Sequence, residues 1–115
     1  MLNGMITNKY GSRAWYQNGQ LHRTDGPAVE YADGSKCWCQ NNQLHRTNGP
    51  AIEFAYGDKA WYQNNKRHRT DGPAVEYTDG YKAWWFKGVE YDFNDWLNLV
   101  DITEVQKTVM RLQYA

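Results

Sequence analysis

Three histidine–arginine pairs are the side chains of this sequence that are best suited to catalysis or anion binding. Each pair is followed, two positions after the arginine, by a carboxylate or an amide: His22, Arg23 and Asp25; His45, Arg46 and Asn48; His68, Arg69 and Asp71. An imidazole near a carboxylate can act as a general acid or base, and a guanidinium can bind an anion. An active site is needed only once, whereas this pattern occurs three times. The recurrence favours a structural role, in which each histidine packs beside a tryptophan across a hairpin and bonds a turn carbonyl.

The three arginines could also form a ladder that binds phosphates. Glutamates recur at the same interval and are expected on the same face, where they would neutralise the arginines: Glu30, Glu53 and Glu76. Nucleic-acid binding needs several uncompensated phosphate contacts, and the chain balances 13 Lys and Arg against 13 Asp and Glu. The sequence therefore favours a solvated salt-bridge ladder and disfavours nucleic acid as a partner. An anionic ligand, if one binds, is expected at the most basic segment, near Lys66, Arg67 and Arg69.

An aromatic row at the same 23-residue interval is the strongest candidate for an interface. Tyr16 and Tyr62 occupy equivalent positions, Cys39 stands between them, and Trp85 takes the position in the last unit. Evenly spaced aromatic side chains on a sheet face could grip a partner protein or stack on bases. Cys37 and Cys39 lie two apart in an expected strand, which is poor disulfide geometry. We identify no catalytic, metal or cofactor motif.

The sequence predicts that these residues lie on short β-strands joined by tight turns. Segment 13–17 is rich in β-formers, and Asn18-Gly19 is a strong type I′ hairpin signal. Repetition of strand and turn every 23 residues predicts a mainly β fold, an antiparallel meander of about three and a half repeats. The array is expected over 1–91, divided into a half repeat 1–10, repeats 11–33, 34–56 and 57–79, and a partial repeat 80–91.

Two-residue turns also predict which side chains share a face, because directly opposed residues lie on the same side of a sheet. A turn at Asn18-Gly19 pairs Tyr16 with Leu21, and a turn at Asp33-Gly34 pairs Tyr31 with Lys36. One face is then expected to form the core, with Trp15, His22, Val29 and Tyr31. The other face is expected to be wet, with Ala14, Tyr16, Leu21, Arg23, Ala28 and Glu30.

From about Phe93 the apolar period changes from strand to helix. Phe93, Trp96, Leu97 and Val100 fit one helical face, and Asp101 to Glu104 has capping-box spacing. A second apolar stripe follows, made of Val105, Val109 and Leu112. We expect short helices over 92–115 to cap the sheet, with the aromatic cluster Trp84 to Phe86 buried beneath them.

The motif Trp-Tyr-x-Asn-Gly-x-x-His-Arg-x-x-Gly-Pro-Ala resembles MORN-like repeats, over roughly residues 5–91. It is most similar to a variant of small phage, bacterial and giant-virus proteins. The resemblance implies an elongated, curved antiparallel sheet, and family roles in lipid binding or protein scaffolding. This chain departs from the usual pattern, since Arg23 follows His22 where MORN repeats carry glycine.

These observations predict a non-enzymatic protein-interaction module. The phage-like resemblance implies an inhibitor of a host factor or defence system, located in the cytoplasm of the host. The alternative is a protein that sequesters a small ligand or nucleotide through its repeated arginine and aromatic residues. No apolar run is long enough to span a bilayer, and self-association through the sheet edge or the C-terminal helices is a further expectation.

Overall fold

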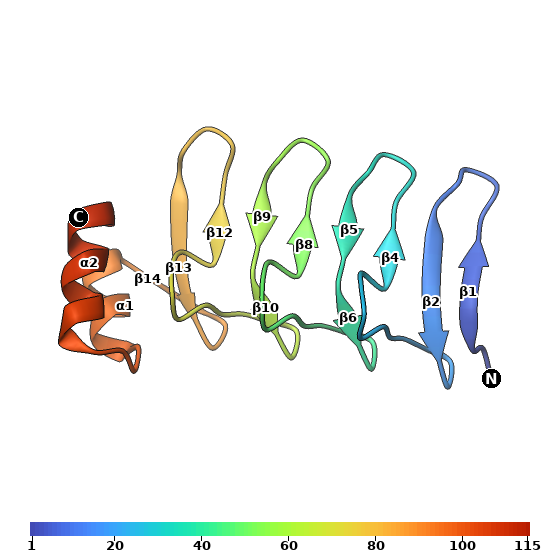
Figure 1. Cartoon of the computed structure of the whole chain (residues 1–115), viewed down its shortest axis with the longest axis horizontal. Coiled ribbons are helices and arrows are strands. Elements are labelled where there is room, and N and C mark those ends of the chain that lie inside the picture. The colour runs from blue at the N-terminus through green and yellow to red at the C-terminus, as the bar shows by residue number, and fades with distance from the viewer.

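A computed structural model describes all 115 residues as an elongated antiparallel sheet closed at one end by two helices (Figure 1). The molecule measures 47 × 28 × 21 Å. The main sheet runs in the order β1-β2-β4-β5-β8-β9-β12-β13-β14, so strands that are close in sequence are neighbours in space. This arrangement confirms the predicted antiparallel meander with C-terminal helices. No helix is both long and apolar enough to cross a membrane.

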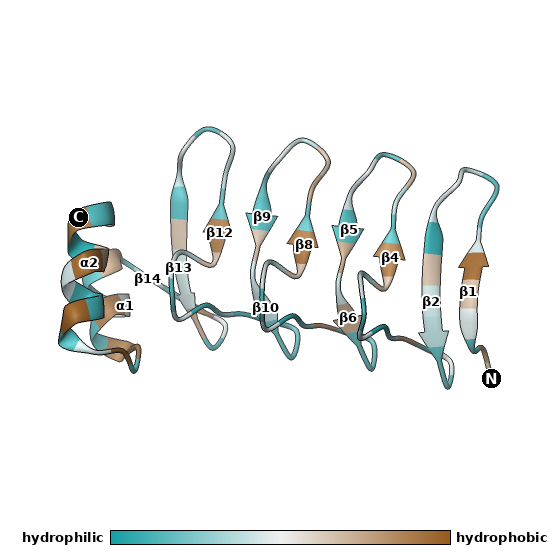
Figure 2. Ribbon diagram, viewed as in Figure 1, coloured by the Kyte–Doolittle hydropathy of each residue, from teal (hydrophilic) through white to brown (hydrophobic).

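The strands are short, and their positions recur every 23 residues. The strands are β1 Gly4–Thr7, β2 Arg13–Gln17, β3 Gln20–Leu21, β4 Val29–Glu30, β5 Lys36–Cys37, β6 Cys39–Gln40, β7 Gln43–Leu44, β8 Ile52–Glu53, β9 Lys59–Ala60, β10 Tyr62–Gln63, β11 Lys66–Arg67, β12 Val75–Glu76, β13 Lys82–Phe86 and β14 Val89–Tyr91. The helices are α1 Phe93–Leu99 and α2 Glu104–Tyr114. Figure 2 shows one hydrophobic strand of this set per repeat: β1, β4, β8 and β12.

Each full repeat builds an upper and a lower hairpin, and its tryptophan is where the chain changes partners. In the second repeat the Trp38 N–H donates to the Ala51 carbonyl at 2.7 Å, toward the upper strands. The Trp38 carbonyl accepts from the His45 N–H at 3.0 Å, toward the lower hairpin. Trp15 and Trp61 make the same two bonds. The tryptophan therefore joins two ladders that share one strand.

The lower hairpins follow the predicted two-residue turns. Tyr16 pairs with Leu21 and Gln17 with Gln20, with Asn18 at φ 52° and Gly19 at φ 77°. The second and third repeats have Asn-Asn in these left-handed positions. Asn42 has a reason to replace glycine, because its side-chain Oδ1 accepts from the Leu21 N–H of the preceding repeat at 2.8 Å. Asn65 accepts from Leu44 in the same way, at 3.3 Å.

The upper turns contradict the predicted register. The backbone N–H of Tyr31 donates to the Ser35 carbonyl. Below this bond, Glu30 pairs with Lys36 and Val29 pairs with Cys37, so the loop holds three residues and not two. The extra residue arises because the Tyr31 carbonyl accepts from the Gly34 N–H, which closes a turn one residue wider. A shift of one residue moves side chains to the opposite face.

The predicted faces are therefore wrong in composition. Val29 shares a face with Ala14 and Tyr16, which the prediction placed opposite it. Glu30 pairs with Arg13 on the face of Trp15.

Side chains at both ends of the strands link each repeat to the next. At the upper turns, Ser12 accepts from Ala32 N–H, Ser35 from Ala55 and Asp58 from Thr78, at 2.9, 2.9 and 2.8 Å. At the lower turns, the Nδ1 atoms of the three histidines accept from backbone N–H groups of the following repeat, with these pairs: His22 and Asn41, His45 and Asn64, His68 and Lys87. The repeats are therefore joined by side-chain bonds as well as by the ladder.

The helices close the array over Trp84. Its indole ring lies 4.8 Å from the Phe93 ring and 4.6 Å from the Trp96 ring, and the indole N–H of Trp96 donates to the Arg69 carbonyl at 3.0 Å. Trp96, Leu97 and Val100 are buried with Trp84, which confirms the predicted helical face. Trp85, by contrast, points to the other side of the sheet, because it pairs with Glu90 while Trp84 pairs with Tyr91.

The second predicted helical stripe does not cover the sheet. Val105, Val109 and Leu112 are 75, 53 and 83% exposed. Met110 and Tyr114 contact the core instead, together with Ile102 just before the helix. A capping box begins the helix, but two residues later than the predicted one at Asp101 and Glu104: Thr103 and Gln106 bond each other's backbone N–H groups. The box fixes where α2 starts, but packing against Trp84 selects the face that turns inward.

Candidate binding surfaces

The sheet has two unlike faces, and the first is built from stacked tryptophan and arginine side chains. The guanidinium carbons of Arg23, Arg46 and Arg69 lie 3.8 Å from the ring centroids of the tryptophans of their own repeats, Trp15, Trp38 and Trp61. We call this side, together with the loops that carry the arginines, the Trp–Arg face. Trp84 lacks an arginine, and the helices occupy the corresponding place.

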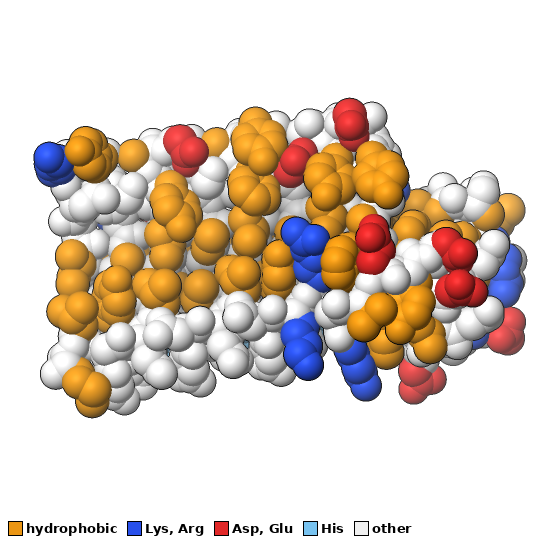
Figure 3. Space-filling view, turned by 180° about the vertical axis from the view of Figure 1, so that it is seen from behind, with side chains coloured by type: hydrophobic (Ala, Val, Ile, Leu, Met, Phe, Trp, Pro, Cys, Tyr) orange, Lys and Arg blue, Asp and Glu red, His pale blue; other side chains and the backbone are white.

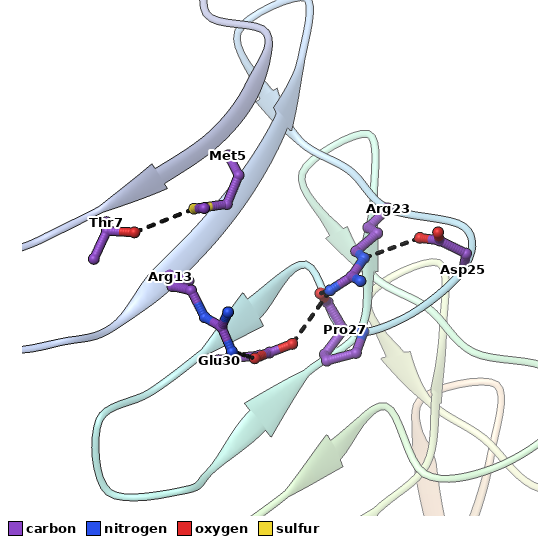
Figure 4. Close-up of polar contacts among 7 residues, drawn as sticks. All are labelled: Met5, Thr7, Arg13, Arg23, Asp25, Pro27 and Glu30. Atoms are coloured by element: carbon purple, nitrogen blue, oxygen red, sulfur yellow. Dashed lines mark hydrogen bonds and ion pairs between the residues drawn. The ribbon is translucent and has the colours of Figure 1, made fainter.

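Each arginine of this face is held by polar partners as well as by the ring. Figure 4 shows Arg23 donating to the Asp25 carboxylate at 2.9 Å, to the Pro27 carbonyl at 3.1 Å and to Glu30 at 3.2 Å. Arg46 and Arg69 repeat this pattern toward Glu53 and Glu76. The predicted salt-bridge ladder is therefore present, although on the face opposite to Tyr16.

The glycine of each Gly-Pro-Ala segment makes room for this guanidinium. A Cβ added at Gly49 would lie 2.8 Å from Arg46 Cζ, and the equivalent contacts at Gly26 and Gly72 are 2.9 and 2.7 Å. The following proline contributes its carbonyl oxygen as an acceptor for the arginine. Ala28, Ala51 and Ala74 then lie fully buried. The repeated Gly-Pro-Ala segment therefore packs around the stacked arginine of its own repeat.

The three histidines also have defined roles in the structure. Since Nδ1 of each ring accepts an N–H from the next repeat, the neutral ring carries its proton on Nε2. The bond is to a turn N–H of the neighbouring hairpin, and not to a carbonyl as predicted. Burial, and in second place the Lys87 ammonium, lower the pKa of His68 below its usual value. His68 also packs against Phe86, with ring centroids 5.0 Å apart.

The second face is apolar and carries no covering layer over the repeats, and we call it the open face. Cross-strand partners define its middle row: Ile6, Ala14, Val29, Cys37, Ile52, Ala60, Val75 and Ala83. A lower row lies two residues along the same strands: Tyr16, Leu21, Cys39, Leu44, Tyr62, Arg67 and Trp85. An upper row continues beyond β4, β8 and β12: Tyr31, Phe54 and Tyr77. Figure 3 shows these hydrophobic side chains as a band along the array, with polar groups below it.

The upper row is the part of this face that sequence reasoning missed. Tyr31, Phe54 and Tyr77 are 46, 36 and 38% exposed, and they recur every 23 residues. The assumed two-residue turn placed Tyr31 on the core side with Trp15. A depression between Tyr31 and Phe54 is lined by Cys37 and Ile52, with Asp33 and Ser35 at the turn. The even spacing of these aromatics was visible in the sequence, but their face depended on the loop length.

The predicted site residues divide between the two faces. Tyr16, Tyr62 and Trp85 lie half-buried in the lower row of the open face. Arg67 joins them, because its Nε donates to the Tyr62 hydroxyl at 3.0 Å and its guanidinium lies 4.9 Å from the Trp85 ring. The Trp85 indole N–H is buried without a hydrogen-bond partner.

The remaining predicted residues lie on the Trp–Arg face. Lys66 pairs with Gln63 and is therefore on the side opposite to Arg67. Arg23, Arg46 and Arg69 are on this side too, stacked on their tryptophans. The structure therefore does not combine the repeated arginines and the aromatic row in one site.

A polar groove of about 500 Å³ opens on the Trp–Arg face between the loops of the first two repeats. Thr24, Gln40, His45 and Thr47 are among the residues that line it. Arg46 faces this groove with one carboxylate partner fewer than Arg23 or Arg69, because its Nε bonds the neutral Asn48 at 3.2 Å.

The two cysteines are free thiols on the open face. Burial raises the pKa of Cys39 to about 11 and also raises the pKa of Cys37. Both are therefore protonated and poorly nucleophilic near neutral pH. No three His, Cys, Asp or Glu side chains converge in a group that could hold a metal ion.

Comparison of the chain with protein-family models, with curated proteins and with solved structures gave no match.

Proposed function

We propose that the chain is a non-enzymatic protein-binding module that uses the open face, on a repeat array of the MORN-like kind. One observation carries the proposal: three rows of mostly apolar side chains follow the sheet, and over the first two repeats these rows contain no charged residue. Contiguous apolar surface of this kind is typical of interaction sites. In its most specific form, the proposal is that the partner is a host factor that the chain inhibits, as the phage-like resemblance implies.

The open face is large enough for a small interface. The nine strands of the main path leave eight intervals. At about 4.8 Å each they give a length of about 38 Å, and the outer two of three rows about 7 Å apart lie about 14 Å from each other. The product, about 500 Å², is what one partner contributes to a small protein–protein interface, below the standard of about 800 Å². Exposed tyrosine and phenylalanine supply the kind of side chain that is enriched at such interfaces.

Paired lysine substitutions on the two faces test the proposal. Tyr31→Lys with Phe54→Lys places two charges on the open face, at positions exposed enough to accept them without unfolding. The control, Gln20→Lys with Gln43→Lys, adds the same charge to the Trp–Arg side, where the third repeat already has Lys66. Tagged protein should retain a stoichiometric partner from host lysate, the control should retain it too, and the open-face variant should lose it. Equal retention by both variants would refute the open face as the binding surface.

A second candidate function has one specific observation in its favour. Asn48 stands where the other repeats have aspartate, so at the groove Arg46 has a single carboxylate partner, Glu53, where Arg23 and Arg69 each have two. A small anion such as a nucleotide phosphate could bind there through Arg46, His45 and the threonine hydroxyls.

Equilibrium dialysis with inorganic phosphate and with ATP tests this second function. Asn48→Asp should abolish binding, because it restores the carboxylate that the other repeats carry. Asn98→Asp, an exposed position of α1, makes the same charge change away from the groove and should leave binding intact. Absence of binding to the unaltered protein excludes the groove as an anion site.

A further inference from the structure

The N-terminal strand β1 is the one end of the sheet that no element protects. All four of its residues are exposed, and its only neighbour is β2. Proteins usually blunt such edges with proline, lysine, a bulge or a covering segment, and Gly4–Thr7 contains neither proline nor lysine. The other end of the array is covered by α1 and α2, which pack over Trp84. The two ends are therefore treated differently.

The free edge of β1 has the geometry of an edge that is paired inside the array. Met5, Ile6 and Thr7 correspond, 23 residues apart, to Ala28, Val29 and Glu30. Inside the array, the Ala28 carbonyl accepts from the Trp15 N–H, so the backbone N–H and C=O groups of Ala28 point toward the preceding strand. Just after β1, the Asn8 N–H donates to the Ser12 carbonyl on the β2 side. Because backbone groups point to alternate sides along a strand, those of Met5 and Thr7 point away from β2. Figure 4 shows the Met5 and Thr7 side chains together on one side of this strand, where the Thr7 hydroxyl donates to the Met5 sulfur at 3.2 Å.

We propose that two copies of this chain pair through β1 into a closed two-fold dimer with one continuous sheet. The two-fold axis stands perpendicular to the sheet at Ile6. The outward groups of Met5 then bond those of Thr7 of the second copy, and the reverse, while the two Ile6 side chains meet in the non-hydrogen-bonded position. This register keeps both open faces on the same side, and it joins their middle rows through Ile6.

The second copy is the occupant that the structure favours for three reasons. It carries a free antiparallel edge that matches β1 in length, since it is the same strand. No charged side chain lies within Gly4–Thr7, so no like charges oppose each other across the axis. Ile6 is 43% and Met5 49% exposed in the single chain, and pairing would cover both. Because the helices close the far end, association stops at two copies and does not continue into a fibre.

Sedimentation equilibrium of the full chain and of two edge variants tests the dimer. The unaltered protein should sediment with twice the 13.5 kDa chain mass. Ile6→Lys should weaken dimerisation about tenfold or more, because two ammonium groups would then face each other. Ile6→Val is the matched control and should remain dimeric. Circular dichroism should show the same folded state in all three, since Ile6 is already half-exposed.

Single cysteines then test the register. With Cys37 and Cys39 replaced by serine, Ile6→Cys should form an intermolecular disulfide under mild oxidation, because paired residues at non-hydrogen-bonded sites bring Cα atoms within reach. Met5→Cys should not, since Met5 faces Thr7 of the second copy. A monomeric mass at every concentration, or cross-linking at Met5 in place of Ile6, overturns the proposal. Loss of partner capture by open-face variants is a separate result, since Tyr31 and Phe54 do not lie on β1.

Discussion

Replacement of Gly49 by alanine should destabilise the protein through Arg46 and not through the backbone. Gly49 is not in the left-handed region, so alanine itself fits the local conformation. Its Cβ, however, would lie 2.8 Å from Arg46 Cζ and 2.9 Å from its Nη1. Contacts below about 3 Å force the guanidinium to move. The loss of folding stability then equals the contribution of the interactions that Arg46 loses when it moves.

The structure allows that cost to be worked out. The Arg46 side chain is 22% exposed, stacks on Trp38 at 3.8 Å and donates to Pro50 and Glu53 at 3.0 Å. A cation–π contact of this kind contributes about 0.5–2 kcal/mol. A net hydrogen bond contributes about 1 kcal/mol, so the total loss should be about 2–3 kcal/mol when the ion pair retains part of its strength.

A double-mutant cycle assigns the loss to its cause. Urea unfolding, followed by the fluorescence of the six tryptophans, gives the free energy of unfolding for the unaltered protein, Gly49→Ala, Arg46→Ala and the double variant. Once Arg46 is absent, Gly49→Ala should cost little, and the coupling between the two positions should be about 2 kcal/mol. A Gly49→Ala variant as stable as the parent, or an equal cost with and without Arg46, would refute the packing unit described for the Trp–Arg face.

Three further predictions concern other parts of the fold. Burial lowers the pKa of His68 in the folded state, so near the ordinary histidine pKa of about 6.5 the unfolded state binds more protons than the folded state. The free energy of unfolding should therefore fall as the pH drops through that value and recover above it. Urea midpoints across this window check it, and His68→Gln should flatten the profile; an unchanged slope contradicts the neutral ring. Trp96→Phe should cost about 2 kcal/mol by removing the bond to the Arg69 carbonyl and leaving that buried region less well packed. The urea midpoint measures this loss, and a midpoint equal to the parent's would contradict it. On α2, Val109→Lys should change the free energy of unfolding by less than about 0.5 kcal/mol, whereas Met110→Lys should cost several times more. Thermal unfolding of the two variants measures the difference. The reverse order would mean that the helix packs with its other face.

Local turn chemistry explains how much of this fold was predictable. Asn18-Gly19 dictated a two-residue turn, and the pairing of Tyr16 with Leu21 followed correctly. Asp33-Gly34 carried a similar signal, yet the turn that forms closes from Tyr31 to Gly34 and holds one more residue. A single residue of loop length exchanged the faces of Val29 and Glu30. The period fixed the meander, but no local signal distinguished the two turns.

The candidate surfaces were predictable where they depended on spacing and missed where they depended on long-range packing. The Arg–Glu ladder follows from the 23-residue period, and it is present. Stacking of Arg23 on Trp15 was not predicted, because strand alternation was assumed to continue to Arg23, whereas β3 ends at Leu21 and the chain then turns Arg23 onto the Trp15 ring. The exposed stripe of Val105, Val109 and Leu112 looked equivalent to a buried stripe in sequence. The position of α2 over Trp84 decided between them.

Site-specific photo-crosslinking tests most directly whether the open face is the binding surface. A photoreactive phenylalanine analogue placed at Phe54 would lie on the open face, and the same analogue at Gln43 of the same repeat would lie on the opposite side. After irradiation in host cells, we expect a discrete cross-linked protein adduct from position 54 and none from position 43. An adduct from position 43 alone would contradict this expectation, and would place the binding surface on the Trp–Arg face.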